Sequence, residues 1–338
     1  MNLTCAPCRT DPGVLTQTLG DTPVAGLYFH LGDPDVYRYQ NTDYLVVPME
    51  SGFLPGAIAV FRCSDLSYVL YAELTEQAGD AGWCAISRDG KLFSSLQHAS
   101  TLLVYDMDWS CVNAPCEAFV TFQEEIPLKD EQGNPLPDLV TTQGGKFAPD
   151  GTLLYLTSGF FDDNEALQAS EGITVMDTAS WWRVAHSTNG YGQFNYYYNP
   201  GCCTYGEPEG LVVWDLDNGR APGMSGQLHV FRTNNDPIGT DSVTFFHYTN
   251  VIRVTPGTDC NLSNCCPNFQ LPGCPTLPNS VPCAIGGSTC PMQIFAEALD
   301  YAWSGAEIRL RAATYTGTMT ISKRVRLTSD GGVARLGG

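Results

Sequence analysis

The chain has 338 residues and a formal net charge of −19 at pH 7. An acidic chain repels phosphate backbones, so no nucleic-acid partner is expected. Hydrophobic residues make up 43% of the sequence, which excludes global disorder, and no apolar run is long enough to span a bilayer. With 34 Gly and 22 Pro, the composition favours many short strands joined by tight turns.

The 14 cysteines predict an oxidising compartment. We therefore expect a disulfide-rich secreted or extracellular protein, with no signal peptide at the start of this chain. Cys111 and Cys116 close a short loop and are the favoured disulfide pair. A metal cluster is the alternative, but only Cys5 and Cys8 have the spacing of a zinc knuckle, and no second such pair follows.

In chain order, an N-terminal Cys-containing segment (1–23) precedes a repeating region (24–255). Residues 82–93 and 145–156 both read as strand, Asp-Gly turn, strand, which is a strong hairpin signal. A further strand follows each hairpin, at 101–106 and 172–177. Similar strand pairs are expected in an earlier and a later unit, at 44–48 and 57–61, and at 210–215 and 227–231.

Four such units recur at roughly 50 to 60 residues, the period of propeller blades with loop insertions. The predicted fold class is all-β, a β-propeller of about five blades, with the fifth completed by the N-terminal segment and a strand at 243–248. Two stacked sheets are the alternative.

The composition changes after the repeats. A Cys- and Pro-rich disulfide linker is expected over 256–291. The C-terminal segment, 292–338, has helical spacing over 294–303 and then short alternating runs, which predict a short β-solenoid-like tail.

Residues 148–156, APDGTLLYL, resemble the SPDG hairpin of YVTN-like β-propellers, and 194–230 is similar to uncharacterised bacterial secreted propeller proteins. The segment from the expected helix to Lys323 resembles the first rungs of a pectin-lyase-like right-handed β-helix. These resemblances imply architecture. The tail is too short to imply lyase activity.

Carboxylates at the entries to several strands could converge on one Ca²⁺ ion, which takes about 6 to 8 oxygen ligands. The Glu-Gly entry resembles that of calcium-dependent propellers of the phytase-like and lactonase-like kinds. Separate turn carboxylates are the alternative reading. The candidate metal ligands at such entries are Glu50, Glu171, Glu207 and Glu209. Asp215 and Asp217 are further candidates in a separate run, 215–219, that has the alternating oxygens of a calcium loop but lacks its distal Glu, and a turn is the alternative there.

An aromatic stretch after Gly190 reads as a long exposed loop, and such loops on rigid scaffolds recognise carbohydrate or protein surfaces. Packing between blades is the alternative. The candidate binding residues are Tyr191, Phe194, Tyr196, Tyr197, Tyr198 and Tyr205.

No nucleophile elbow, phosphate loop or metalloprotease motif is present. The first hypothesis is therefore a non-enzymatic binding or structural protein. An unpaired last rung invites pairing with another chain, so it could form a homo-oligomer or homo-polymer and build filaments. The alternative is a calcium-dependent propeller hydrolase of phosphoesters or lactones, in which His30, His98 or His229 near the channel moves protons.

Overall fold

The computed structural model describes residues 22–130, 132–137, 139, 141–159, 172–188, 191–192, 206–214, 228–234, 242–248, 251–254, 307–315, 320–321, 325–330 and 332–336. The expected linker at 256–291 and the expected helix at 294–303 lie outside these residues. So does the aromatic stretch, except for Tyr191 at the start of a short strand.

Four antiparallel sheets follow one another along the chain. The first contains β1 (His30–Leu31), β2 (Asp35–Tyr39), β3 (Thr42–Glu50), β4 (Gly56–Arg62) and β5 (Tyr68–Leu74). The second contains β6 (Ala85–Ile86), β7 (Leu92–Ser94), β8 (Thr101–Met107) and β9 (Val120–Pro127). The third contains β10 (Thr142–Phe147), β11 (Leu153–Ser158), β12 (Gly172–Asp177), β13 (Arg183–Thr188) and β14 (Tyr191–Gly192). The fourth contains β15 (Gly206–Val213), β16 (Leu228–Asn234) and β17 (Ser242–Tyr248).

The two Asp-Gly hairpins are confirmed. One joins β6 to β7 and the other joins β10 to β11. Gly90 and Gly151 occupy their turns with φ of +86° and +77°, a conformation that glycine adopts without steric cost. The local turn signal therefore places the first two strands of the second and third sheets.

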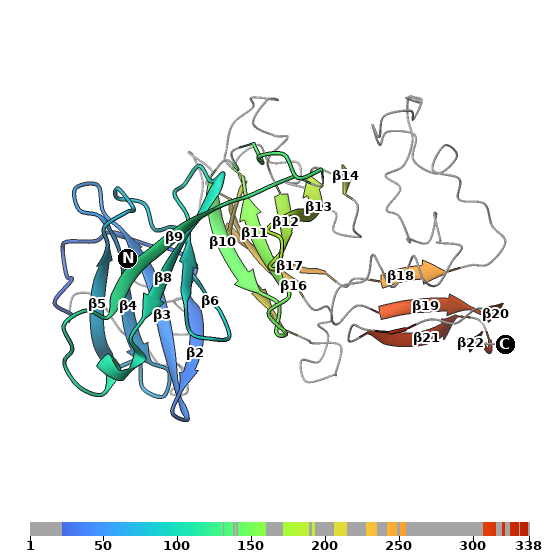
Figure 1. Ribbon diagram of the computed structural model, residues 1–338, viewed down its shortest axis with the longest axis horizontal. Helices are drawn as coiled ribbons and strands as arrows, with labels where there is room; N and C mark the ends of the chain where they lie inside the picture. The colour runs from blue at the N-terminus through green and yellow to red at the C-terminus, as the bar shows by residue number, and fades with distance from the viewer. Residues whose placement is uncertain are drawn as a thin grey trace.

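Apolar side chains join each sheet to the next. Val46 and Ile58 of the first sheet share a buried cluster with Leu103 of the second. Phe93 and Leu102 of the second sheet share another cluster with Leu154 of the third. Consecutive meandering sheets packed face to face, with their first strands converging, make this an all-β propeller (Figure 1).

Residues 243–248 were expected to help complete a fifth blade, and this was wrong. They lie in β17, which pairs antiparallel with β16 as the third strand of the fourth sheet. Alternating apolar residues predicted the strand but not its partner. The described part of the chain contains four blade-like sheets.

The C-terminal strands pair in parallel, unlike those of the propeller. β18 (Val251–Val254), β19 (Glu307–Arg311) and β21 (Arg326–Asp330) form one parallel sheet, and β20 (Thr314–Tyr315) pairs in parallel with β22 (Arg335–Leu336). Ile308 and Leu310 belong to the same buried cluster as Leu211 and Val230 of the fourth sheet. The tail is therefore solenoid-like and shares a hydrophobic core with the fourth sheet. Its strands lie beyond that sheet, toward the C-terminus (Figure 1).

One disulfide joins Cys111 to Cys116, the pair favoured by their spacing. It closes the loop between β8 and β9, where a 3-10 turn, η3 (Trp109–Val112), begins. Cys63 and Cys84 are free thiols. Among the described residues, no helix has the length and apolar character needed to cross a membrane.

Candidate functional site

The first strands of the four sheets meet in a region that we call the hub, consisting of residues 30–35, 82–86, 142–147 and 208–211. Here the first and second sheets are joined through their backbones. The amide of Asp33 donates to the Gly82 carbonyl at 2.9 Å, and the amide of Cys84 donates to the Asp33 carbonyl at 3.1 Å. A Cβ on Gly32 would lie 2.0 Å from the Gly82 oxygen, so only glycine permits this approach.

The other two sheets reach the hub through further glycines. A Cβ on Gly145 would lie 2.0 Å from Cε3 of Trp83, which is fully buried. A Cβ on Gly144 would lie 3.0 Å from Cα of Gly210 on β15. Because glycine has no side chain, the strands β6, β10 and β15 can approach one another closely.

Asp33 links the first sheet to the fourth. Its Oδ2 accepts the amide proton of Leu211 at 3.2 Å, and its Oδ1 lies 2.6 Å from where a Cβ on Gly210 would be. Burial raises the pKa of Asp33 to about 8, although the residue keeps some exposed surface; the Leu211 amide and the Lys146 charge oppose this rise. This carboxyl group acts as a junction between sheets.

Asp35 links three sheets and is only 5% exposed. Its carboxylate accepts the amide of Ile86 on β6 at 2.7 Å and forms an ion pair with Lys146 on β10. Burial is the first cause that raises the pKa of the neighbouring Cys84 thiol well above its usual value, and the charges of Asp35 and Asp33 add to it. Cys84 is therefore a structural thiol and not a nucleophile.

A second polar group lies at the hub and is reached by solvent. Nδ1 of His30 lies 2.6 Å from Oε2 of Glu50, and the two side chains are 32% and 19% exposed. The residues face each other across β1 and β3. A methyl group on Gly82 would lie 3.2 Å from Oε1 of Glu50 and 3.9 Å from Oε1 of Gln143, so these two polar side chains border the same spot.

Asp80 and His98 complete this group. Burial raises the pKa of Asp80, the charge of Glu50 raises it further, and His98 lowers it. The charges of Glu50 and His98 thus both act on the Asp80 carboxyl group. We call this set the outer hub cluster, and its members are His30, Glu50, Asp80, His98 and Gln143.

The predicted metal ligands fall into two groups. Three of them lie on strands that the structure describes. Glu50 lies in the outer hub cluster, and Glu209 directly precedes Gly210 on β15. Glu207 lies on β15 as well, but the structure does not describe its side chain. Glu171, Asp215 and Asp217 lie outside the described residues. The predicted calcium site therefore stays a prediction.

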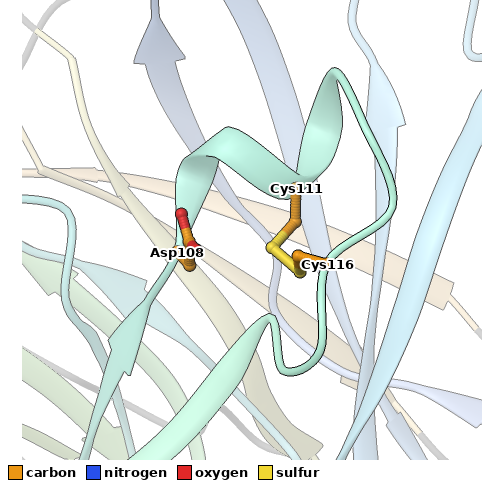
Figure 2. A group of neighbouring side chains, drawn as sticks. All are labelled: Asp108, Cys111 and Cys116. Carbon is orange, nitrogen blue, oxygen red and sulfur yellow. A yellow bond between two sulfur atoms is a disulfide. The ribbon is translucent and has the colours of Figure 1, made fainter.

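Among the described residues, one group of three potential ligands lies within mutual reach: Asp108, Cys111 and Cys116 (Figure 2). Both sulfurs are consumed by the disulfide, and the Asp108 carboxylate accepts from Ser110 N at 3.0 Å and Ser110 Oγ at 2.6 Å. A thiolate is what binds a metal, so this group caps η3 and does not form a metal site.

Sequence reasoning missed several hub residues. Asp33, Asp35, Asp80 and Lys146 were not singled out, although the Gly32-Asp33-Pro34-Asp35 run beside His30 marks an interrupted strand. His229 had two readings, an acid–base residue near the channel or a hydrogen-bonded structural histidine. It is buried, and its Nε2 lies 2.7 Å from the carbonyl oxygen of Trp214, which is a structural contact.

No family model matches the chain, and no curated protein matches it in sequence. Solved structures with a similar arrangement include a complex of KlAtg21 with the coiled coil of AgAtg16, at 11% identity and a TM-score of 0.33; the match covers 67% of this chain and 61% of that one. A GH43 β-xylosidase/α-arabinofuranosidase from a compost metagenome matches at 13% identity and a TM-score of 0.38, over 66% of this chain and 72% of that one. A GH43_1 enzyme from Xanthomonas citri matches at 12% identity and a TM-score of 0.36, over 63% and 67%. Likeness at this level carries no argument about activity.

Proposed function

We propose that the protein is a secreted propeller that hydrolyses small neutral lactones or esters at the outer hub cluster. The observation that carries this proposal is the 2.6 Å contact between His30 and Glu50 on partly exposed surface. When a carboxylate accepts the Nδ1 proton, the imidazole lone pair is on Nε2, which is the form a general base needs. Glu50 thereby becomes the positioning residue and His30 the base.

The reaction uses water as the nucleophile. The water oxygen bonds to the carbonyl carbon while His30 Nε2 takes a proton from it. The carbon–oxygen bond to the leaving group then breaks, and Asp80 gives its proton to the departing oxygen. The raised pKa of Asp80 supports the acid role, because it keeps that carboxyl group protonated to higher pH.

The charge of the site favours a neutral substrate. The Glu50 carboxylate belongs to a chain with a net charge of −19, which repels a phosphoester unless a cation screens it. A lactone or ester carries no such charge. The phosphoester version of the hypothesis therefore requires the predicted Ca²⁺, whereas the lactone version does not.

The test is turnover of a panel of lactones and p-nitrophenyl esters by the purified, oxidised chain. We expect Glu50→Gln and His30→Gln to lower kcat by about 10²- to 10⁴-fold. Activity should fall as pH rises through the pKa of Asp80, and Asp80→Asn should remove that limb of the pH profile. His186→Gln is the matched control, because His186 is a part-buried histidine bonded to Thr174 on β12 and lies outside the cluster.

The same assay separates the alternatives. Turnover that survives a chelator supports the metal-free site, whereas loss with chelator and recovery with Ca²⁺ supports the calcium-dependent hydrolase. Equal activity of the wild-type chain and Glu50→Gln, both shown to be folded by circular dichroism, overturns the assignment. The Cys111–Cys116 disulfide supports the extracellular location.

A second candidate is the non-enzymatic one, assembly through the C-terminal strands. Within the described residues β21 is an edge of the parallel sheet, and exposed apolar side chains lie near it in sequence. They are Ile321 (45% exposed), Val333 (73%) and Leu336 (40%). Exposed edges and apolar side chains favour pairing between chains. Electron microscopy tests this assembly. Regular filaments of the wild-type chain that are absent in Val333→Lys support it, and dispersed wild-type particles at all concentrations contradict it.

A further inference from the structure

A groove lies on the outer side of the propeller, between the first sheet and the loop that follows β8. One wall is strand β5 from Val69 to Glu73, and the other is the segment from Cys111 to Val120. Its volume is about 650 Å³, within the range of binding pockets in proteins. The groove is separate from the hub, and none of the outer hub residues lines it.

β5 presents an unpaired edge to this groove. It is the last strand of the first sheet, bonded to β4 on one side, and no described strand pairs with its other side. In an antiparallel pair, alternate residues of an edge strand direct both their N–H and C=O groups away from the partner. A bulge near Val69 disturbs one end, so the regular edge runs from Leu70 to Leu74.

The opposite wall is held rigidly by several contacts. The Cys111–Cys116 disulfide closes the loop (Figure 2), and the Asp108 amide donates to the Phe119 carbonyl at 2.9 Å across its base. Trp109 anchors it further, because its Nε1 donates to the Gly90 carbonyl at 2.9 Å and its ring packs 4.4 Å from that of Tyr37. A wall that is already ordered loses little entropy when a ligand binds.

The charges in the groove select the ligand. The acidic or basic side chains that line it are Glu73 and Glu117, both of them negative and exposed. Leu70 and Ala72 pack toward the cluster shared by the first and second sheets, so the floor beside the edge is apolar. Self-pairing of two β5 edges would bring together two chains of net charge −19 and is disfavoured.

We propose that this groove binds an extended basic peptide, which adds to the first sheet as a further strand along β5. Backbone hydrogen bonds to the edge supply the affinity, and contacts of lysine or arginine side chains with Glu73 and Glu117 supply the selectivity. The disulfide holds the wall in place. The groove is thus a peptide-docking site independent of the hydrolytic site.

The probe is a short fluorescein-labelled peptide of alternating lysine and valine, titrated with the whole oxidised chain and followed by anisotropy. Its matched control is the same peptide with alternate amides N-methylated, which keeps the charge but removes the donors. We expect the N-methylated peptide to bind at least roughly tenfold more weakly, because several backbone hydrogen bonds are lost. Glu73→Gln and Glu117→Gln should each weaken binding several-fold, whereas Glu124→Gln on β9, outside the groove, should not.

Other outcomes overturn the proposal. If the two peptides bind equally, charge alone attracts them. The same conclusion follows if Glu124→Gln weakens peptide binding as much as Glu73→Gln does. A concentration-dependent dimer in sedimentation velocity that the peptide dissolves assigns the groove to a second copy of the chain. Because the peptide comparison uses the wild-type protein, it remains decisive even if a variant fails to fold.

Discussion

Replacing Gly145 by alanine tests how tightly the hub is packed. The new methyl group would lie 2.0 Å from Cε3 and 2.1 Å from Cζ3 of Trp83. That ring is fully buried, and its Nε1 donates to Ser95 Oγ at 2.8 Å, so it has no room to turn aside. Overpacking in a core costs typically about 1 to 3 kcal/mol, and this overlap belongs at the upper end, so we expect a loss of about 3 kcal/mol.

Such a loss corresponds to a fall in Tm of roughly 4 °C for a chain of 338 residues. It is measured by guanidinium and thermal unfolding with the disulfide intact, followed by tryptophan fluorescence and circular dichroism. Gly52→Ala is the control, because its new methyl group would sit 3.6 Å from the Phe29 ring, an ordinary contact, and should change stability by less than about 0.5 kcal/mol.

A double-mutant cycle decides whether the overlap itself is responsible. Trp83→Leu removes the ring atoms that the methyl group meets, so Gly145→Ala should cost at least about 1 kcal/mol less in that background. If the two substitutions are additive, or if Gly145→Ala is as stable as the wild type, the close approach of β10 to Trp83 is refuted.

Three further predictions concern the charges and the disulfide. The pKa of Asp33 is raised from 3.8 to about 8, so the contribution of Asp33 to stability falls as pH rises between these values. The Tm of Asp33→Asn minus the Tm of the wild type should therefore grow from pH 5 to pH 8. A constant difference contradicts this. Lys146→Met leaves the Asp35 carboxylate buried without its cation and should lower the free energy of unfolding in urea by about 3 kcal/mol. Adding Asp35→Asn should recover most of this loss, and no recovery contradicts the pairing. Replacing Cys111 and Cys116 together by serine should cost about 2 kcal/mol, because the closed loop is short, and an unchanged denaturation midpoint would show that the disulfide contributes nothing.

The strands were predictable where the signal is local. The Asp-Gly turns at 89–90 and 150–151 gave the hairpins, and alternation of apolar residues gave β3, β4, β8 and β12 close to their observed positions. Glu50 was singled out as a metal ligand, a role that stays a prediction, because it follows a clear strand pattern. Its partner His30 was not assigned to it, since the pairing depends on a two-residue strand with no pattern of its own.

The hub could not be predicted because its contacts are not local. Lys146 and Asp35 are 111 positions apart, and Leu211 and Asp33 are 178 apart. Each of these aspartates reads as an ordinary turn residue in the sequence. These residues come together only because the first strands of the four sheets converge. That convergence depends on glycines, which have no side chain to block the close approach.

The parallel pairing of β18 with β19 has a consequence for residues 255–306, which connect them. The two strands run side by side with Val251 opposite Glu307 and Val254 opposite Leu310, so the connection leaves at one end of the pair and must return to the other (Figure 1). A crossover between parallel neighbours needs only about a dozen residues. Most of the stretch is therefore not required to link the strands. The register of β18 against β19 is thus set by the strands themselves and not by the length of the chain between them.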